Sequence, residues 1–194
     1  MKLHCLIQLL ISALILLGLI FNIRNSRLFN FYDHLLHHKL VKNRDGKIWK
    51  VITVLNEPKV VVVWDFLLAG LLVLLHHPWL ALWSLGTLAV TDAVGIFLKH
   101  SVKRKRPLSM RTYRDGYSFP SGHVLSATIM SLMLWQIFGH IMGIWLLITL
   151  IIAWGLVVVS RLNMRAHYPS DVLGATTLAL FCFTIAQQLL GLAF

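Results

Sequence analysis

Phe119-Pro120-Ser121-Gly122-His123 is a short, small and polar stretch that stands directly before a long apolar run. Pro120 suits the first turn of a helix, because its φ is fixed and its missing N–H is not needed there. Ser121 and Gly122 then offer backbone N–H groups at a helix N-terminus, which is a favourable place for an anion such as phosphate. His123 adds a side chain that can donate a proton. An ordinary helix start is the competing interpretation, and the flanking sequence decides between the two.

Charged residues on both sides of this stretch indicate a site for phosphoryl transfer. They are, in chain order, Lys99, Arg106, Arg161, His167 and Asp171. Lysine and arginine neutralise phosphate oxygens, and the planar fork of arginine can bind two of them at once. A histidine nucleophile must be neutral, and a carboxylate that accepts the proton of its second ring nitrogen fixes the tautomer. His167, with Asp171 four residues on, fits this arrangement and leaves His123 to protonate the leaving group.

The composition is that of a polytopic membrane protein. Of the 194 residues, 58% are hydrophobic and 13% are charged, and the mean hydropathy is +0.76. Soluble domains are nearer half apolar and a quarter charged. The formal net charge is +11, but the basic residues separate apolar runs instead of forming one soluble basic face. We therefore expect the membrane bilayer and its anionic headgroups, and not nucleic acid, as partners.

The apolar runs predict an all-α bundle of six membrane spans, which we expect to form a single domain over residues 1–194. The predicted spans cover 6–23, 58–75, 79–98, 123–138, 141–159 and a last segment from Tyr168 or Pro169 to the end. Short connections are expected at His76-His77-Pro78 and at Gly139-His140. The first run is longer than the apolar part of a signal peptide and no small-residue cleavage site follows it, so we expect it to be an uncleaved span. Alternation of the spans brings all the motifs within 99–171 to one membrane face.

The polar segment from Arg24 to about Glu57 is predicted to lie at the membrane surface. Phe29, Tyr32, Leu36 and Leu40 recur at helical spacing, which is typical of an amphipathic surface helix. Asp45-Gly46 marks a turn within this segment.

The remaining candidates for metal binding or chemistry are histidines, carboxylates and cysteines outside the motifs. They are His34, His37, His38, Asp65, Asp92, Cys5 and Cys182. We interpret the histidines as an interfacial polar face, because no cysteine or carboxylate cluster accompanies them. An intramembrane carboxylate is either functional or a hydrogen-bonded group inside the bundle. We favour the second interpretation for Asp65, whereas Asp92, two helical turns before Lys99, could support the site. Both cysteines lie in apolar runs and are interpreted as core residues.

The motifs together resemble the type 2 phosphatidic acid phosphatase family, also described as vanadium haloperoxidase-like phosphatases. The resemblance covers about Lys99 to Asp171 and implies that His167 forms a phosphohistidine, Asp171 orients it and His123 is the acid. It also implies a set of phosphate-binding residues, which are Lys99, Arg106, Ser121, Gly122 and Arg161. Metals and other cofactors are not needed in this family, and the sequence has no acidic cluster of the kind that binds Mg²⁺.

The expected function is therefore that of an integral membrane phosphatase that releases inorganic phosphate from a lipid phosphate. The resemblance suggests phosphatidylglycerol phosphate, phosphatidic acid or a polyprenyl diphosphate as substrate, as in bacterial phosphatidylglycerophosphatases. The alternatives are a phosphotransferase that uses an acceptor other than water, and a non-enzymatic lipid-binding or transport protein. Intact His123, His167 and Asp171 argue against the latter.

The expected location is the cell membrane, and two arguments disagree about the side that the site faces. By the alternation of the spans, Lys2 is the only Lys or Arg on the face opposite the motifs. The positive-inside rule would then put the site in the cytoplasm. The bacterial members of the family imply an extracytoplasmic site, and we expect this orientation because phosphate binding accounts for many of the charges.

Overall fold

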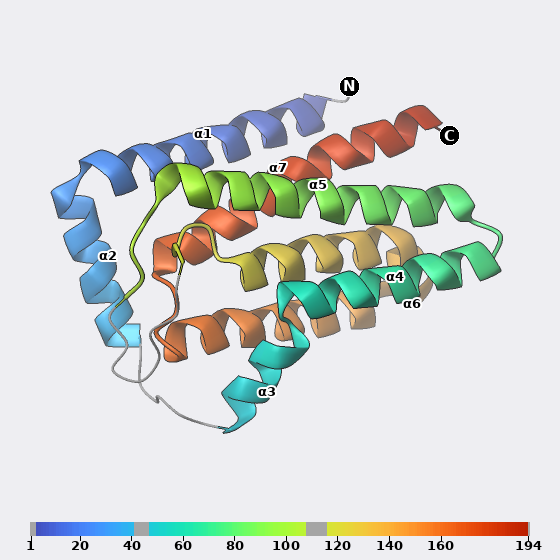
Figure 1. The fold of residues 1–194 in the computed structure, drawn as a ribbon. Helices are drawn as coiled ribbons and strands as arrows, with labels where there is room; N and C mark the ends of the chain where they lie inside the picture. Colours follow the sequence, from blue (N-terminus) through green and yellow to red (C-terminus); the bar gives the residue numbers. More distant parts are fainter. Residues whose placement is uncertain (1–2, 41–46, 108–115, 194) are drawn as a thin grey trace.

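The described part of the chain is built from α-helices, which confirms the predicted fold class. The computed structural model describes residues 3–40, 47–107 and 116–193. Its helices are α1 (Leu3–Asn25), α2 (Arg27–Leu40), α3 (Lys47–Leu55), α4 (Pro58–Leu74), α5 (Pro78–Val102), α6 (Gly122–Asn163) and α7 (Pro169–Ala193). Figure 1 shows α1, α4, α5, α6 and α7 running alongside one another, with α2 turned across one end of the bundle.

Four helices in the described residues are long and apolar enough to cross a membrane, namely α1, α5, α6 and α7. Helix α6 has 42 residues and is interrupted at Gly143, where the chain reverses direction so that its two halves run antiparallel (Figure 1). Helix α4 has 17 residues, which is the lower limit for a span. The six predicted runs thus correspond to α1, α4, α5, the two halves of α6 and α7, with α4 the shortest.

The reversal within α6 lies at Gly143, so the predicted turn at Gly139-His140 is wrong. Gly143 has a φ of 58° and a ψ of −145°, a conformation that glycine adopts without steric cost. Gly139 is instead buried in the helix, where an added Cβ would come within 2.9 Å of the Trp135 ring. Gly139 therefore allows close packing against Trp135, and Gly143 allows the turn.

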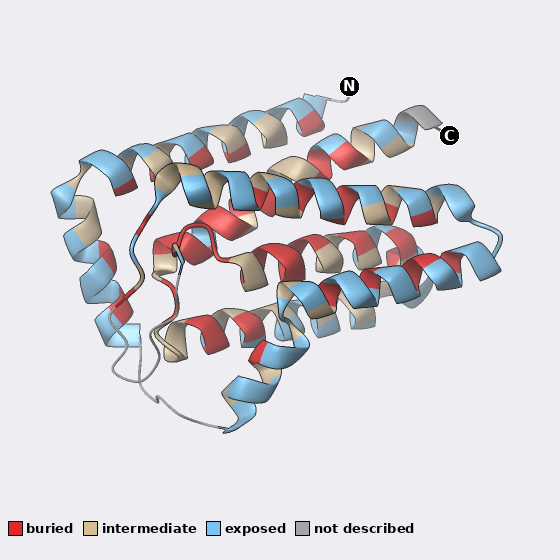
Figure 2. Cartoon of the chain, viewed as in Figure 1, coloured by how far each residue is buried: buried red, intermediate tan, exposed pale blue. Residues whose placement is uncertain are grey.

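The outer surface of the bundle is largely apolar. Leu14, Leu74, Phe97 and Trp145 are each at least 68% exposed, and Figure 2 shows exposed residues along the outward faces of α1, α4 and α5. So much exposed apolar surface would be unfavourable in water. Together with the length of the helices, it supports a multi-pass membrane protein.

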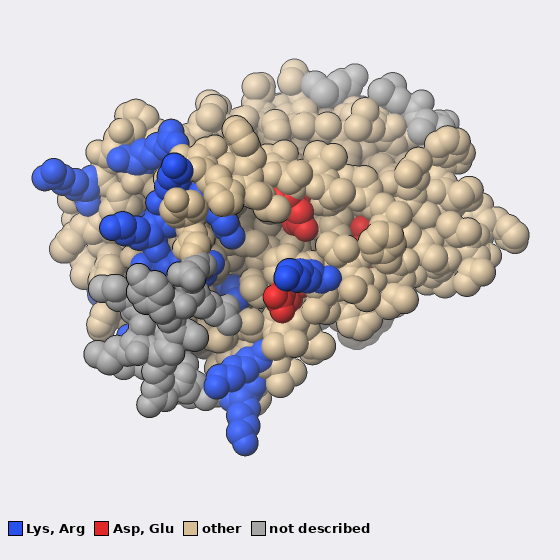
Figure 3. Space-filling view, in the orientation of Figure 1, with Lys and Arg blue, Asp and Glu red and all other residues tan. Residues whose placement is uncertain are grey.

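The ends of the helices that carry the motifs lie together. The C-terminal end of α5, both ends of α6 and the N-terminal end of α7 are found at the end of the bundle where α2 lies (Figure 1). This confirms the prediction that alternation brings the motifs to one face. Lysine and arginine side chains gather over the same end, whereas the opposite end shows none in the view of Figure 3.

Helix α2 is the predicted amphipathic surface helix. Its exposed residues include Phe31, Tyr32 and Leu36, whereas Asp33 and His37 are buried against the bundle. The predicted turn at Asp45-Gly46 lies outside the described residues. Helix α2 therefore turns polar side chains toward the end of the bundle that carries the motifs.

Candidate active site

The stretch before α6 is held against α7. Phe119 is fully buried, and its ring lies so close to Gly174 that a Cβ there would be 2.3 Å from it. The Ser121 N–H donates to the carbonyl oxygen of Asp171 at 3.2 Å. Helix α6 begins at Gly122 with Ser121, in extended conformation, as its N-cap. Pro120 therefore lies before the helix. Our expectation from its fixed φ, that it forms the first helical turn, is wrong.

Of the two donors that Ser121 offers, the hydroxyl is available and the backbone N–H is not. Its Oγ is buried and has no hydrogen-bond partner among the described residues. The N–H that the sequence suggested for an anion is already bound to Asp171. Because a buried hydroxyl without a partner is costly, a bound anion would satisfy it.

Lys99 and Gly122 lie at one small cavity between α4, α5 and α6. The cavity has a volume of about 110 Å³ and is lined by Pro58, Asp92, Gly95, Ile96, Lys99, Pro120, Gly122 and Leu125. A Cβ at Gly122 would be 3.9 Å from the Lys99 Nζ, and the charges of Arg106 and Asp171 also act on Lys99. The carboxylate of Asp92 accepts a hydrogen bond of 3.0 Å from the Ser126 hydroxyl. Asp92 therefore borders the site, whereas Asp65 is buried within α4.

His167 lies in the turn between α6 and α7 and is almost completely buried. Its Nδ1 is 2.8 Å from the carbonyl oxygen of Ser118. A carbonyl oxygen only accepts hydrogen bonds, so Nδ1 carries the proton and Nε2 keeps its lone pair. The nearest carboxylate oxygen of Asp171 is 3.8 Å from Nδ1, which is too long for a hydrogen bond. The hydrogen bond that we assigned to Asp171 is therefore made by the Ser118 carbonyl, with Asp171 at ion-pair distance.

The surroundings of His167 keep its ring neutral. Burial lowers the pKa of His167 to about 4, with Arg106 and Arg161 acting in the same direction and Asp171 opposing them. The ring is thus uncharged near neutral pH, which is the form that a nucleophile needs. Both arginines are close enough to influence this ring, although they come from different segments.

The two predicted phosphate-binding arginines are held by backbone and side-chain acceptors. Arg106 donates to the carbonyl oxygens of Ala166 at 3.2 Å and Gly116 at 3.3 Å. Arg161 is fully buried near the end of α6, and it donates to the Thr53 hydroxyl of α3. Helix α3, which carries no motif, therefore supports a candidate phosphate-binding residue.

Arg104 is a part of the site region that the sequence analysis missed. It is buried and donates to the carboxylates of Asp171, at 2.8 Å, and of Asp33 in α2, at 2.7 Å. In the sequence it is one of several basic residues in the loop after α5, and only its position two residues before Arg106 sets it apart. Asp33 was likewise assigned to no role.

The histidines take different positions. His123 is half-buried in the first turn of α6. His37 is buried and packs edge-on against Tyr168, with ring centroids 5.6 Å apart, so within the predicted interfacial polar face it lies on the side toward the bundle. Within the described ranges, no group of three or more His, Cys, Asp or Glu residues is arranged to hold a metal ion.

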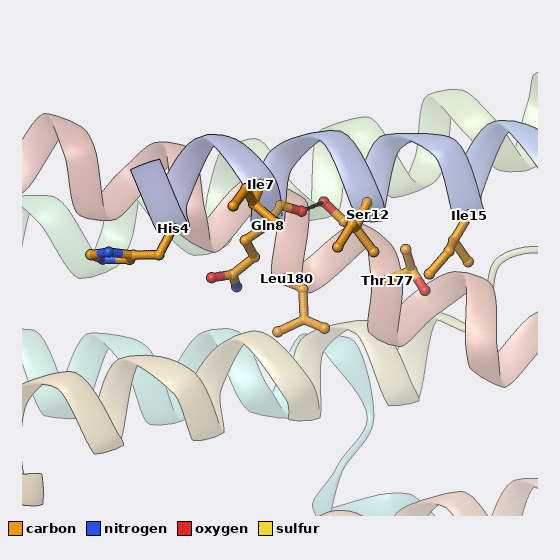
Figure 4. Close-up of a pocket in the computed structure, with 8 residues that line it drawn as sticks. His4, Ile7, Gln8, Ser12, Ile15, Thr177 and Leu180 are labelled. Atoms are coloured by element: carbon orange, nitrogen blue, oxygen red, sulfur yellow. Dashed lines mark hydrogen bonds between the residues drawn. The ribbon is translucent and has the colours of Figure 1, made fainter. Parts of the chain in front are cut away.

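A larger cavity of about 340 Å³ lies between α1 and α7. Figure 4 shows its lining, in which half of the residues are apolar, with His4, Gln8, Ser12 and Thr177 as the polar members. None of the motif residues reaches it. It is therefore not the site that the motifs predicted.

Residues 80–192 match the PAP2 superfamily. The chain belongs to this superfamily. The PAP2 match contains all the motif residues from Lys99 to Asp171, which confirms the resemblance found in the sequence. In fold, the chain is similar to the protein described as "the first transmembrane PAP2 type phosphatidylglycerolphosphate phosphatase from Bacillus subtilis". The TM-score is 0.84 over 95% of this chain and 96% of that one, with 20% identical residues. No curated protein matches the chain in sequence.

Proposed function

We propose that this PAP2 protein is a membrane phosphatase that hydrolyses lipid phosphates through a phosphohistidine on His167. The observation that carries the proposal is the hydrogen bond of the buried His167 ring. Its Nδ1–H donates to the Ser118 carbonyl oxygen at 2.8 Å, which leaves the lone pair on Nε2. Burial lowers the pKa of the ring to about 4, and the charges of Arg106 and Arg161 act in the same direction. A neutral imidazole on which two positive charges act suits attack on a phosphoryl group.

The proposed reaction has two steps that share one set of residues. In the first, Nε2 of His167 attacks phosphorus, the bond to the lipid oxygen breaks, and His123 donates a proton to that oxygen. In the second, water attacks the phosphohistidine, His123 accepts a proton from the water, and inorganic phosphate leaves with Nε2 restored. Lys99, Arg106 and Arg161 neutralise the phosphate oxygens in both steps, and Ser121 and Gly122 bind the same group.

A lipid substrate is supported by the position of these residues. They lie at one end of a bundle whose outer surface is apolar, so a lipid can keep its chains in the bilayer while its headgroup reaches the site. The similar Bacillus subtilis protein is described as a phosphatidylglycerolphosphate phosphatase. We therefore propose phosphatidylglycerol phosphate as the first substrate to test, followed by phosphatidic acid and polyprenyl diphosphate.

Activity is expected to be independent of metal ions, because Lys99, Arg106 and Arg161 supply the charge that a metal would otherwise supply. The purified protein in detergent should release phosphate from at least one of these lipids, and EDTA should leave the rate unchanged. Loss of activity on chelation that Mg²⁺ restores would contradict the proposed chemistry. Transfer to an added alcohol without phosphate release would indicate a phosphotransferase.

We also propose that the site faces the extracytoplasmic side. Lys105, at the motif end, and His140, three residues before the reversal of α6, are both exposed. Single cysteines at these positions, in a variant with Cys5 and Cys182 changed to alanine, report on opposite ends of the bundle. A membrane-impermeant thiol reagent on intact cells should label Lys105→Cys and spare His140→Cys. The reverse pattern would place the site in the cytoplasm.

A further inference from the structure

Arg104 connects α2 to the start of α7 through its two terminal nitrogens. One nitrogen donates to the Ser170 hydroxyl at 2.6 Å and to Asp171 at 2.8 Å. The other donates to the amide oxygen of Asn30 at 3.1 Å and to Asp33 at 2.7 Å. Because Asn30 and Asp33 are three residues apart in α2, they lie on the same face of that helix. A surface helix without a sequence motif thus reaches the region of the proposed nucleophile.

The connection is shielded from water. Less than a tenth of Arg104, Asp33 and Asp171 is exposed, and the ring of Tyr168 covers the guanidinium group at 4.2 Å. Charges in such surroundings act on one another more strongly than charges at the surface. The net charge of Asp33, Arg104 and Asp171 therefore affects the electrostatic potential at the neighbouring side chains.

Two carboxylates share one guanidinium group, so the trio Asp33, Arg104 and Asp171 carries a net charge of −1. With Arg104 and Asp171 alone, the charge would cancel. The net negative charge of the trio lies beside His167, because a carboxylate oxygen of Asp171 is 3.8 Å from its Nδ1. When Nε2 bonds to phosphorus while Nδ1 keeps its proton, the ring gains positive charge, which a surplus of negative charge stabilises.

We propose that Asp33 is a positioning residue that maintains this negative charge by sharing Arg104 with Asp171. It touches neither the substrate nor the His167 ring, and it acts through Arg104. The inference rests on the proposed role of His167 as the nucleophile. It gives α2 a part in the chemistry in addition to its place at the membrane surface.

The competing explanation is that Asp33 only fastens α2 to α7. Its carboxylate also accepts hydrogen bonds from the N–H of Ser170, at 3.2 Å, and from the Ser170 hydroxyl. Ser170→Ala removes the hydroxyl bonds to Asp33 and Arg104 without changing any charge, so it is a matched control. The charge itself is tested by Asp33→Asn, which takes the trio to zero, and by Asp33→Asn/Arg104→Gln, which returns it to −1.

We expect Asp33→Asn to lower kcat by about 10- to 100-fold, the loss typical when an outer partner of a reacting group is removed. KM should change little, because Asp33 does not contact the substrate. The double variant should recover most of the lost kcat, and Ser170→Ala should stay close to the parent. A double variant no faster than Asp33→Asn, or a Ser170→Ala variant as slow, would overturn the proposal.

The rate of phosphoenzyme formation gives a second test, which needs only the folded Asp33→Asn variant. In single turnovers with labelled lipid phosphate, at a temperature where both proteins are folded, this variant should form the phosphoenzyme more slowly than the parent. Equal rates would refute the role of Asp33 even if the double variant does not fold. A parent protein that turns over without any phosphoenzyme would instead refute the proposed function, so the two failures can be distinguished.

Discussion

Replacement of His167 by asparagine is expected to lower kcat by about 10⁴-fold or more, as is usual when a nucleophile is lost. Asparagine has an amide N–H that can replace Nδ1–H as the donor to the Ser118 carbonyl, but it has no counterpart of Nε2. The fold should therefore persist while covalent chemistry stops. The measurement is phosphate release from the best lipid substrate, together with trapping of an acid-labile, alkali-stable phosphoenzyme in the parent.

His140→Asn is the matched control for this prediction. His140 is exposed near the reversal of α6, away from the motif end, so the same substitution there should leave kcat within about twofold, as for most surface changes. Substantial turnover by His167→Asn, or a parent that forms no phosphoenzyme, would contradict the covalent mechanism.

The arrangement of the helices and the convergence of the motifs could be predicted from the sequence, because the length of each apolar run determines where the next connection falls. The connection between α4 and α5 does lie at His76-His77, with Pro78 opening α5, and Pro169 does open α7. The reversal at Gly143 could not be predicted in the same way. Two glycines lie four residues apart in similar apolar surroundings, and only packing against Trp135 identifies Gly139 as the helical one.

Within the site, side chains in motifs were predictable and their backbone partners were not. A carbonyl oxygen such as that of Ser118 belongs to every residue type, so no pattern marks it as the acceptor for His167. Arg104 and Asp33 are 71 positions apart and come from a basic loop and an amphipathic helix, where charged residues are ordinary. Their pairing depends on how α2 packs against α7, which only the folded chain reveals.

Arg161 is the site of the second large effect that we expect. Its side chain is fully buried, its charge acts on His167, and it donates to the Thr53 hydroxyl. Arginines that stabilise a transferring phosphoryl group contribute about 10³- to 10⁵-fold to the rate. Arg161→Ala should therefore lower kcat/KM by about 10³-fold or more, whereas Arg161→Lys, which keeps the charge but loses the fork, should recover part of that loss.

Arg165 provides the control, because it follows Arg161 by four residues, is half-buried and has no part in the proposed mechanism. Arg165→Ala should change kcat/KM by no more than about threefold. Vanadate, which resembles a phosphoryl group in transfer, gives a readout that does not depend on turnover. It should raise the thermal midpoint of the parent and of Arg165→Ala, because a ligand that binds only the folded state stabilises it, and it should have little effect on Arg161→Ala. If vanadate stabilised Arg161→Ala as much as the parent, Arg161 would not be a phosphate-binding residue.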